Sequence, residues 1–251
     1  MSLSIIIPCK NEEQNIEQTI ETICSYISEK IHDYQINVIN DFSTDKTSNI
    51  LNQIAKNNKK IKIFENEKRG LGGAINCGIS NSDKKYSVIV MADLSDSPND
   101  IVRYYNEISD KNLDAVLGSR FLKNSEVIDY PKKKLIINRI FNFITKVMFF
   151  ENYNDFTNAF KIYKTEVLKE IRPIVSENFN VFLELPLKII IRKYNYSVIN
   201  IDWRNREKGD AKFKIKELGS KYLFTLLYCF FEKILLNQKR DKISNINKVN
   251  R

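Results

Sequence analysis

Short apolar runs rich in β-branched residues alternate with helical segments through the first 120 or so residues, and this alternation limits the possible folds most strongly. Five such runs predict strands at residues 4–8, 35–40, 61–65, 87–91 and 115–118. The segments between them predict helices over roughly 10–29, 45–58, 72–80 and 98–109. Strands and helices that alternate at this spacing form βαβ units. The sequence therefore predicts an α/β fold with a mostly parallel central sheet flanked by helices.

Two apolar segments in the second half of the chain predict C-terminal amphipathic helices. They cover residues 135–150 and 221–236, with lysine or arginine inside or beside each. Neither offers about 18 uninterrupted apolar residues, the length typical of a membrane-spanning helix. Two interpretations stay open: helices packed in the core, or helices in the membrane interface, where apolar faces, aromatic rings and flanking cations favour binding. Residues 237–251 form a polar tail.

The charge balance narrows the possible partners. The 251 residues carry a formal net charge of +9, which favours an anionic partner such as a phosphorylated substrate, a membrane surface or a nucleic acid. A nucleic-acid-binding protein typically interleaves basic and aromatic residues on a sheet or carries a recognition helix. This sequence has neither pattern, so we expect no nucleic acid partner.

Cysteine usage and the N-terminal sequence indicate the compartment. The four cysteines have neither zinc-site spacing nor a paired framework, and no signal peptide is recognisable at the N-terminus. Reduced thiols in the cytoplasm are the simple interpretation. The single histidine, His32, excludes a histidine-rich metal site.

Polar residues follow the predicted strands at the points where those strands end. They lie at residues 8–12, 41–45, 93–96 and 119–120. In open parallel sheets, ligands bind outside the carboxyl ends of the strands. The sequence therefore predicts a binding site at this edge of the sheet.

Four motifs occur in a fixed order at these positions: Ile5-Ile-Ile-Pro-Cys-Lys-Asn-Glu-Glu, Asn40-Asp-Phe-Ser-Thr-Asp-Lys-Thr, Gly70-Leu-Gly-Gly-Ala and Met91-Ala-Asp-Leu-Ser-Asp-Ser-Pro. Together they resemble glycosyltransferase family 2, which has the GT-A fold. Three downstream motifs are Gly118-Ser-Arg, Asp155-Phe-Thr-Asn-Ala-Phe-Lys and Arg206-Glu-Lys-Gly-Asp-Ala-Lys. They are similar to the polyprenyl-phosphate sugar transferase branch, the relatives of dolichol-phosphate mannosyltransferase.

The resemblance implies a UDP- or GDP-sugar as the donor. The residues that it places around the nucleotide sugar are Pro8, Lys10, Glu12, Asp41, Ala92 and Asp93. The family often has an aromatic residue at the position of Lys10 and a second aspartate at the position of Asn40. On this basis residues 1–125 form the nucleotide-sugar-binding part of the catalytic domain.

The same resemblance implies a divalent cation, Mg²⁺ or Mn²⁺, at Asp93. Such an ion, held by carboxylates, neutralises a leaving diphosphate. The family commonly shows Asp-Ala-Asp where this chain has Met91-Ala92-Asp93. A thioether is a poor ligand for these ions, so Asp96 is the candidate for the second oxygen. Its alternative role is to cap the following helix, with Pro98 at an early helical position.

Residues 126–236 would supply the acceptor side and the contact with the membrane. By resemblance Arg120 and Arg206 act with Asp93 in catalysis, because arginine suits bidentate contacts with phosphate. The residues expected on the acceptor side are Lys134, Asp155, Thr157, Asn158, Glu184 and Lys212. For Glu184, which stands alone in an apolar run, a solvent-facing helix position is the alternative.

These inferences give three functional hypotheses. The first is inverting transfer of a sugar to a polyprenyl phosphate, dolichyl or undecaprenyl, on the cytoplasmic face of the membrane. The second is a family 2 transferase with a hydroxyl acceptor in cell-surface polysaccharide synthesis, which needs a general base such as Asp155 or Glu184. The third is a non-catalytic nucleotide-sugar-binding subunit. A membrane-protein partner or a homo-oligomer is compatible with each.

Overall fold

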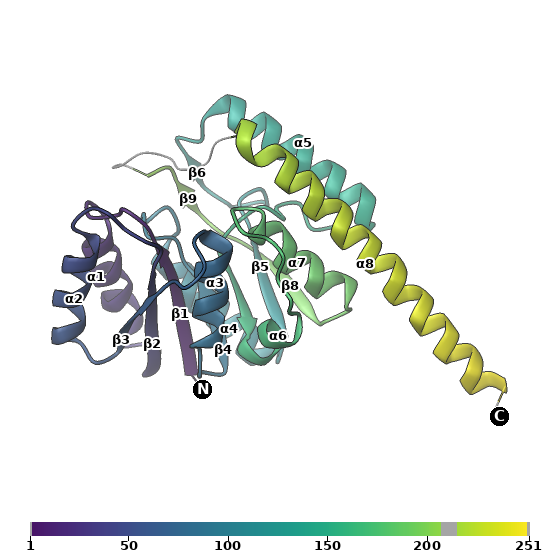
Figure 1. Cartoon of the computed structure of the whole chain (residues 1–251), viewed down its shortest axis with the longest axis horizontal. Helices are drawn as coiled ribbons and strands as arrows, with labels where there is room; N and C mark the ends of the chain where they lie inside the picture. Colours follow the sequence, from purple (N-terminus) through teal and green to yellow (C-terminus); the bar gives the residue numbers. More distant parts are fainter. Residues whose placement is uncertain (1, 207–214, 250–251) are drawn as a thin grey trace.

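A seven-stranded sheet, in the order β3-β2-β1-β4-β7-β5-β8, forms the centre of the molecule (Figure 1). The computed structural model describes residues 2–206 and 215–249, and in the last helix it describes the side chains of 219–237. The strands are β1 (Ser2–Cys9), β2 (Asp33–Asn40), β3 (Ile61–Glu65), β4 (Tyr86–Ile89), β5 (Ala115–Ser119), β7 (Lys161–Lys164) and β8 (Tyr196–Asn200). β7 runs antiparallel to β4 and β5, and the other neighbours are parallel. The predicted α/β fold with a mostly parallel sheet is confirmed.

Helices cover both faces of this sheet, and the side chains of β1 show why. Ile6 belongs to one buried core, and Ile5 and Ile7 belong to the other. Successive side chains of a strand point to opposite faces, so an unbroken apolar strand needs a helical layer on each side. The core of Ile6 includes α3 (Leu71–Ser80), α6 (Thr165–Glu170) and α7 (Val181–Ile191). The opposite core includes α1 (Ile16–Ile27), α2 (Thr47–Asn57) and α4 (Pro98–Asp110).

A short parallel ribbon connects the second half of the chain to the carboxyl ends of the strands. It consists of β6 (Val127–Ile128) and β9 (Trp203–Arg204). Trp203 also forms an isolated antiparallel bridge with Asp96, and the backbone N–H of Arg204 donates to the carbonyl of Ser95 at 3.0 Å. The ribbon therefore holds the chain before residue 206 against the loop that follows β4.

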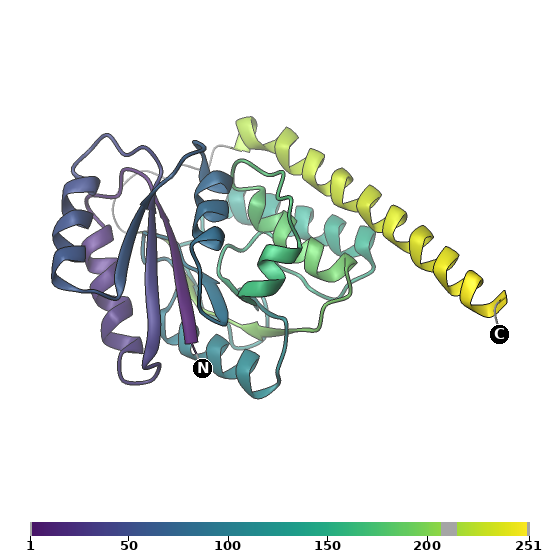
Figure 2. The ribbon, with the colours of Figure 1, turned by 60° about the horizontal axis from the view of Figure 1, so that its bottom comes forward.

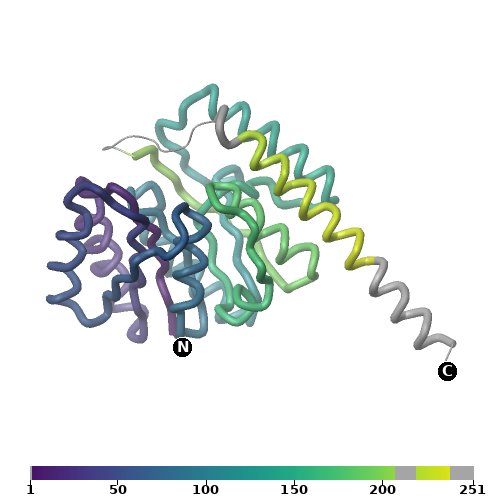
Figure 3. The backbone as a smooth tube through the Cα atoms, in the orientation of Figure 1, coloured from purple at the N-terminus to yellow at the C-terminus, as the bar shows by residue number. Residues whose placement is uncertain are grey.

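Two long helices, α5 (Lys132–Phe149) and α8 (Ile215–Val249), lie side by side along one edge of the molecule (Figures 1 and 2). In Figure 3 the yellow part of α8 lies along α5, drawn in teal. The rings of Phe141 and Tyr222 are 5.6 Å apart, and those of Phe149 and Phe230 are 6.2 Å apart. Both contacts advance in the same direction, so the two helices run parallel. Among the helices within residues 2–206 and 215–249, none is long and apolar enough to cross a membrane.

The structure differs from the sequence-based prediction at several element boundaries. The first helix begins at Ile16 instead of residue 10 or 11. Asn11 has a positive φ of 48°, and the backbone N–H groups of Asn11 and Glu12 donate to Ser43 Oγ and Thr47 Oγ1, so this segment is a loop tied to the end of β2. β4 ends at Ile89, which leaves Met91 in the following loop. α8 continues to Val249, beyond the expected helix end at 236.

Candidate active site

Asp41, directly after β2, fastens three segments together at the carboxyl edge of the sheet. Its Oδ1 accepts hydrogen bonds from Asn66 Nδ2 at 2.6 Å and from the backbone N–H of Gly70 at 2.9 Å. Lys10 Nζ lies 3.6 Å from Oδ2. Gly70 has a φ of 117°, which residues with a side chain rarely adopt. The Gly70 turn, the loop after β1 and the end of β2 therefore meet at this buried carboxylate, as expected for the nucleotide pocket.

Glu12 is a second buried carboxylate at this edge, placed by the loop that follows Pro8. Its backbone N–H donates to Thr47 Oγ1 at 2.9 Å, and Asn15 Nδ2 donates to its Oε2 at 2.9 Å. Its Oε1 lies 3.5 Å from Arg206 Nη2. The predicted pocket residue Glu12 therefore contacts one of the predicted catalytic residues.

Asp93 lies in a tight turn after β4. Its Oδ1 accepts the backbone N–H of Ser95 at 3.2 Å, across Leu94, which has a φ of 54°. Its Oδ2 accepts Arg206 Nη2 at 2.5 Å. Ala92 is buried, and its carbonyl oxygen accepts Thr19 Oγ1 of α1 at 2.9 Å. The turn is thus anchored to α1 on one side and to Arg206 on the other.

Asp96 is a carboxyl group in an unusual electrostatic environment. It is 5% exposed, and its Oδ2 has no hydrogen-bond partner among the residues that the structure describes. Burial, and then the negative charge of Asp93, raise the pKa of Asp96 to about 7. The protonated form of Asp96 is therefore favoured more strongly than that of an ordinary carboxyl group.

Arg120, after β5, makes a buried bidentate ion pair with Asp155. Nε donates to Oδ2 at 2.8 Å, Nη2 donates to Oδ1 at 2.7 Å, and the backbone N–H adds a third bond of 3.0 Å. The guanidinium also lies 5.5 and 5.8 Å from the ring centres of Tyr130 and Trp203. Cation–π contacts of this kind orient the plane of an arginine. Asp155 and two aromatic rings therefore fix Arg120 in one position.

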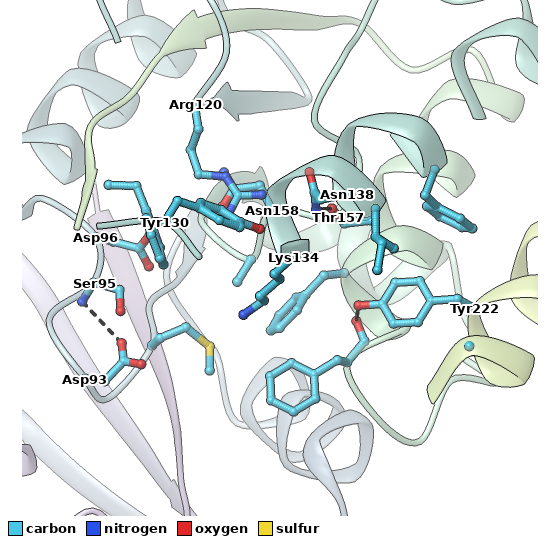
Figure 4. A pocket seen from close by; sticks show the side chains of 18 residues that line it. Asp93, Ser95, Asp96, Arg120, Tyr130, Lys134, Asn138, Thr157, Asn158 and Tyr222 are labelled. Atoms are coloured by element: carbon cyan, nitrogen blue, oxygen red, sulfur yellow. Dashed lines mark hydrogen bonds between the residues drawn. The ribbon is translucent and has the colours of Figure 1, made fainter. Parts of the chain in front are cut away.

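A cavity of about 240 Å³ opens between these residues and the long helices (Figure 4). Asp93, Asp96, Arg120 and Lys134 line one part of it. The rings of Tyr130 and Trp203 lie beside Arg120 in this part. The remaining wall is mainly apolar and aromatic, with contributions from Met91, Ile137, Phe141, Ala159, Phe179, Phe182 and Tyr222. The cavity therefore has one charged end and one apolar end.

Lys134 lies between the two ends. In Figure 4 its ammonium points into the cavity, with Asp93 and Asp96 on one side and Tyr222 on the other. Burial, followed by the positive charges of Arg120 and Arg206, lowers the pKa of Lys134. The cations Arg120 and Arg206 repel the Lys134 ammonium while Asp93 attracts it, so an anion bound beside Lys134 would stabilise its charged form.

Thr157 and Asn158, two of the residues predicted for the acceptor side, also line the cavity. Thr157 Oγ1 accepts Asn138 Nδ2 of α5 at 2.7 Å. Asn158 Nδ2 donates to the carbonyl of Gly118 at 3.2 Å. Both residues therefore tie the loop before β7 to its neighbours and shape the cavity wall.

Glu184, also expected on the acceptor side, lies in α7 and outside the cavity wall. It is fully buried in α7, pairs with Lys188 at 3.0 Å, and accepts the backbone N–H groups of Val175 and Ser176 at 2.9 and 2.8 Å. The solvent-facing alternative for Glu184 is therefore wrong, and within the described chain the cavity wall does not include it. Its carboxylate instead holds the loop before α7. Lys212, the other expected acceptor-side residue, lies outside the described residues.

Sequence reasoning missed three residues of the site. Tyr130 and Trp203 form the aromatic wall beside Arg120. Lys161 is buried beneath the cavity loop, and its ammonium donates to the carbonyls of Phe156, at 3.2 Å, and Asn158. Burial lowers the pKa of Lys161 to about 7. Two signals were available, because Trp203 is the only tryptophan and Lys161 ends the Asp155 motif.

Asp93 and Asp96 are too few to hold a divalent cation by themselves, but they can do so together with the phosphate oxygens of a bound substrate. In the part of the chain that the structure describes, no three His, Cys, Asp or Glu residues group in a way that could hold a metal. Asp93 and Asp96 line the same cavity, and Asp96 Oδ2 is a buried oxygen with no hydrogen-bond partner among the described residues. Mg²⁺ is commonly held by one or two carboxylates together with substrate phosphates. The residues therefore suit an ion that shares its coordination sphere with a diphosphate.

The sheet, the carboxylates at its carboxyl edge and the flanking helices define a GT-A fold. The model of the family described as "Glycosyl transferase family 2" matches residues 4–172. The chain belongs to this family and is a glycosyltransferase by class.

Relatives and solved structures agree with this assignment. The chain is 25% identical to the polyprenol monophosphomannose synthase of Mycolicibacterium smegmatis over 232 residues, covering 86% of each chain. It is 25% identical to the dolichol-phosphate mannosyltransferase of Pyrococcus furiosus, covering 87% of this chain and 61% of that protein. It is 23% identical to glycosyltransferase AglD of Haloferax volcanii and spans 37% of that protein. Glucosyl-3-phosphoglycerate synthase of Mycobacterium tuberculosis, solved with Mn²⁺, UDP and phosphoglyceric acid, shares the fold, with a TM-score of 0.68 and 16% identity, over 91% of this chain and 78% of that one.

Proposed function

We propose that this chain transfers one sugar from a nucleotide diphosphate sugar to the phosphate of a polyprenyl phosphate, with inversion at the anomeric carbon. The observation that carries the proposal is the cavity with a charged end and an apolar end. A polyprenyl phosphate has the same two-part chemistry. The names of two relatives, a polyprenol monophosphomannose synthase and a dolichol-phosphate mannosyltransferase, support this acceptor class.

The charged end suits an acceptor that is already anionic. A phosphate monoester carries negative charge at neutral pH, so its oxygen attacks without a strong general base. Catalysis then depends on positioning and on charge stabilisation. In this proposal Lys134 and Arg120 attract the acceptor phosphate, and the bond from the anomeric carbon to the leaving diphosphate breaks as the new C–O bond forms.

The donor would lie at the edge marked by Asp41, Glu12 and Asp93. We propose a UDP- or GDP-sugar whose nucleoside contacts Asp41 and the loop around Lys10, and whose diphosphate reaches Asp93. Mg²⁺ or Mn²⁺ bound there with Asp93 and Asp96 would neutralise the leaving diphosphate. The solved neighbour with Mn²⁺ and UDP supports this arrangement.

The apolar end continues onto an exposed surface, the α5–α8 apolar face. Its members are Ile136, Ile137, Ile140, Phe143, Ile144, Val147, Phe150, Leu223, Phe224, Leu227, Phe231, Ile234 and Leu235. Exposed large apolar side chains gathered on two neighbouring helices indicate an interaction site. Exposed cations at Lys132, Lys133, Arg139 and Lys221 accompany it. We propose that this face binds a membrane surface with anionic lipids, from which the acceptor enters the cavity.

Polar contacts hold α8 in the orientation that exposes this face. Asn180 Nδ2 donates to Thr225 Oγ1 at 2.9 Å in a buried position. Further along the helix, Arg192 Nη2 pairs with Glu232 at 2.7 Å. The opposite side of α8 is therefore specified by hydrogen bonds and ion pairs, which fixes the direction of the apolar side chains.

One observation favours a second candidate, transfer to a hydroxyl acceptor. That chemistry needs a general base. Asp155 is engaged by Arg120 and Glu184 by Lys188, so neither is suited to the role. Asp96 lines the cavity, burial raises its pKa to about 7, and its Oδ2 has no hydrogen-bond partner among the described residues, so it has the properties of such a base.

A partition assay distinguishes these candidates. The full chain is incubated with Mn²⁺, a radiolabelled UDP- or GDP-sugar and a polyprenyl phosphate in detergent micelles, and the products are extracted with organic solvent. We expect label in the organic phase, and we expect Asp93→Asn to abolish it. Label that appears only in water-soluble product would establish the hydroxyl acceptor instead. Donor binding without any transfer would make the chain a binding subunit.

A further inference from the structure

Arg206 pairs with two carboxylates, Asp93 and Glu12, at the proposed donor site. Its Nη2 lies 2.5 Å from Asp93 Oδ2 and 3.5 Å from Glu12 Oε1. The exposed fractions of the three side chains are 14%, 10% and 7%. Charge-assisted hydrogen bonds between groups that are this well shielded are strong. Arg206 therefore holds the two carboxylates together.

The backbone delivers Arg206 to this position. β9 ends two residues earlier, at Arg204, whose N–H donates to the carbonyl of Ser95 at 3.0 Å. The N–H of Asn205 donates to the carbonyl of Ile128 at 3.1 Å. Successive hydrogen bonds to the Asp93 loop and to β6 fix the chain up to residue 205. The contact with Asp93 is therefore built into the fold.

The carboxylate that Arg206 engages is the one that a metal ion would need. Asp93 Oδ2 is the acceptor of the arginine, and Met91 offers a thioether where a carboxylate would hold the other side of the ion. A metal ion that arrives alone must displace the guanidinium from Asp93 and brings no anion to take the place of that carboxylate beside Glu12. A metal ion that arrives with a diphosphate brings phosphate oxygens, which a guanidinium binds in bidentate geometry.

We propose that Arg206 is an exchangeable counter-charge that gates the donor site. Before the metal–nucleotide complex binds, Arg206 neutralises Asp93 and Glu12 and excludes a free divalent cation. When the metal–nucleotide complex enters, Arg206 moves from the carboxylates to the phosphates, and Asp93 becomes a metal ligand. Metal binding is thereby coupled to nucleotide binding. This inference rests on the proposed function in one respect, that the donor is a nucleotide diphosphate.

Mn²⁺ binding, followed by the loss of the free-ion signal in electron paramagnetic resonance, tests the gate. The full chain is titrated with Mn²⁺ alone and with Mn²⁺ plus UDP or GDP. For the unmodified chain we expect nucleotide to tighten Mn²⁺ binding at least tenfold. For Arg206→Gln we expect Mn²⁺ alone to bind at least tenfold more tightly than it does to the unmodified chain, and we expect the effect of nucleotide to shrink. Arg206→Lys keeps the charge and is expected to resemble the unmodified chain.

Arg204→Gln is the matched control, because it removes a positive charge from an exposed side chain of the same segment. It is expected to leave Mn²⁺ binding unchanged. Circular dichroism verifies that each variant is folded. Equal binding of Mn²⁺ alone to Arg206→Gln and to the unmodified chain would overturn the gate. If neither nucleotide binds to any variant, the proposed donor is wrong. The affinity for Mn²⁺ alone, compared between Arg206→Gln and the unmodified chain, still tests whether Arg206 excludes the free ion.

Discussion

Arg120 and Asp155 are joined by two side-chain hydrogen bonds of 2.8 and 2.7 Å, although they are 35 residues apart in the sequence. Both side chains are almost completely removed from solvent. The pair joins the end of β5 to the loop before β7, which are the two segments that form the floor of the charged end of the cavity. Arg120 therefore has a structural role in addition to its predicted contact with phosphate.

Asp155→Asn is expected to destabilise the fold and to abolish transfer. Removing one partner of a buried ion pair leaves the other charge uncompensated, at a cost of about 3–5 kcal/mol in the free energy of unfolding. Urea denaturation measures this change. Asp33→Asn is the control, because it breaks an exposed pair with Lys84, and it should cost less than about 1 kcal/mol. Equal losses in the free energy of unfolding for the two substitutions would show that the buried Arg120–Asp155 pair stabilises the fold no more than the Lys84–Asp33 pair does.

Met91→Asp is expected to increase the affinity for Mn²⁺ in the absence of nucleotide. The substitution adds a carboxylate to the loop that contains Asp93 and Asp96, and carboxylate oxygens suit this ion far better than a thioether. One added ligand is expected to tighten binding about tenfold, equivalent to about 1.4 kcal/mol. Isothermal titration calorimetry measures the dissociation constant. Met91→Leu keeps the apolar character, so a similar gain in that variant would contradict the prediction.

The buried ammonium of Lys161 is expected to make the free energy of unfolding increase with pH between about 7 and 10. Burial lowers the pKa of Lys161 to about 7, from 10.5. Between these values the unfolded chain holds a proton that the folded chain lacks, so the contribution of this group to stability rises with pH. The penalty for burying the ammonium is fully present below about pH 7 and is relieved as the pH rises towards 10.

Lys161→Met removes this titration. Its stability relative to the unmodified chain should fall by about 1 kcal/mol for each pH unit between 7 and 9. Urea denaturation at three pH values across that range provides the measurement. Lys62→Met, at an exposed position of β3, should show no such trend. A stability difference for Lys161→Met that stays constant with pH would show that Lys161 remains charged in the folded protein.

Replacing Phe143 and Phe231 together by aspartate is expected to abolish binding to lipid vesicles. These side chains are 66% and 59% exposed, so the substitutions should leave the unfolding temperature nearly unchanged. Each buried phenylalanine contributes about 1.5–3 kcal/mol, so the loss should exceed a hundredfold in partition coefficient. Sedimentation with vesicles that contain anionic lipid measures it.

Tyr26→Ser is the control for membrane binding, because Tyr26 is exposed on α1, away from the long helices. It should not alter sedimentation. If the double variant instead converts a dimer to a monomer without any change in vesicle binding, the α5–α8 apolar face is an interface between copies of the chain.

The sequence was sufficient for the first half of the fold, because the five early strands are short runs rich in isoleucine, valine and other apolar residues, separated by helical segments. It also placed Asp41 and Asp93 at strand ends, where local order along the chain determines position. β7 was missed because a four-residue antiparallel insertion has no periodic signal of its own. α7 was missed because an apolar run with Pro186 inside does not distinguish a helix from a strand.

Partnerships between distant residues were beyond sequence reasoning. Arg206 and Asp93 are 113 residues apart, and only the fold shows that they touch. Glu184 was assigned to the acceptor side or to solvent because its isolation in an apolar run hides its partners. Its partners are Lys188, four residues on in the same helix, and the backbone N–H groups of Val175 and Ser176, and the two backbone contacts leave no pattern of side-chain types in the sequence. The polarity of the site could be predicted, whereas its pairing could not.

The loop that Glu184 holds has a consequence for recombining this chain with its relatives. At Gly72 any side chain would overlap the carbonyl oxygen of Ser176, and the N–H of Gly72 donates to the carbonyl of Glu177 at 3.0 Å. The glycine turn of the donor side and the segment leading into α7 therefore fit together backbone to backbone. A chimera that takes its first 125 residues from one transferase and the remainder from another must match at this seam. Chimeric transferases that combine a donor side and an acceptor side from two family members are therefore constrained at Gly72, although Gly72 contacts neither substrate in our proposal.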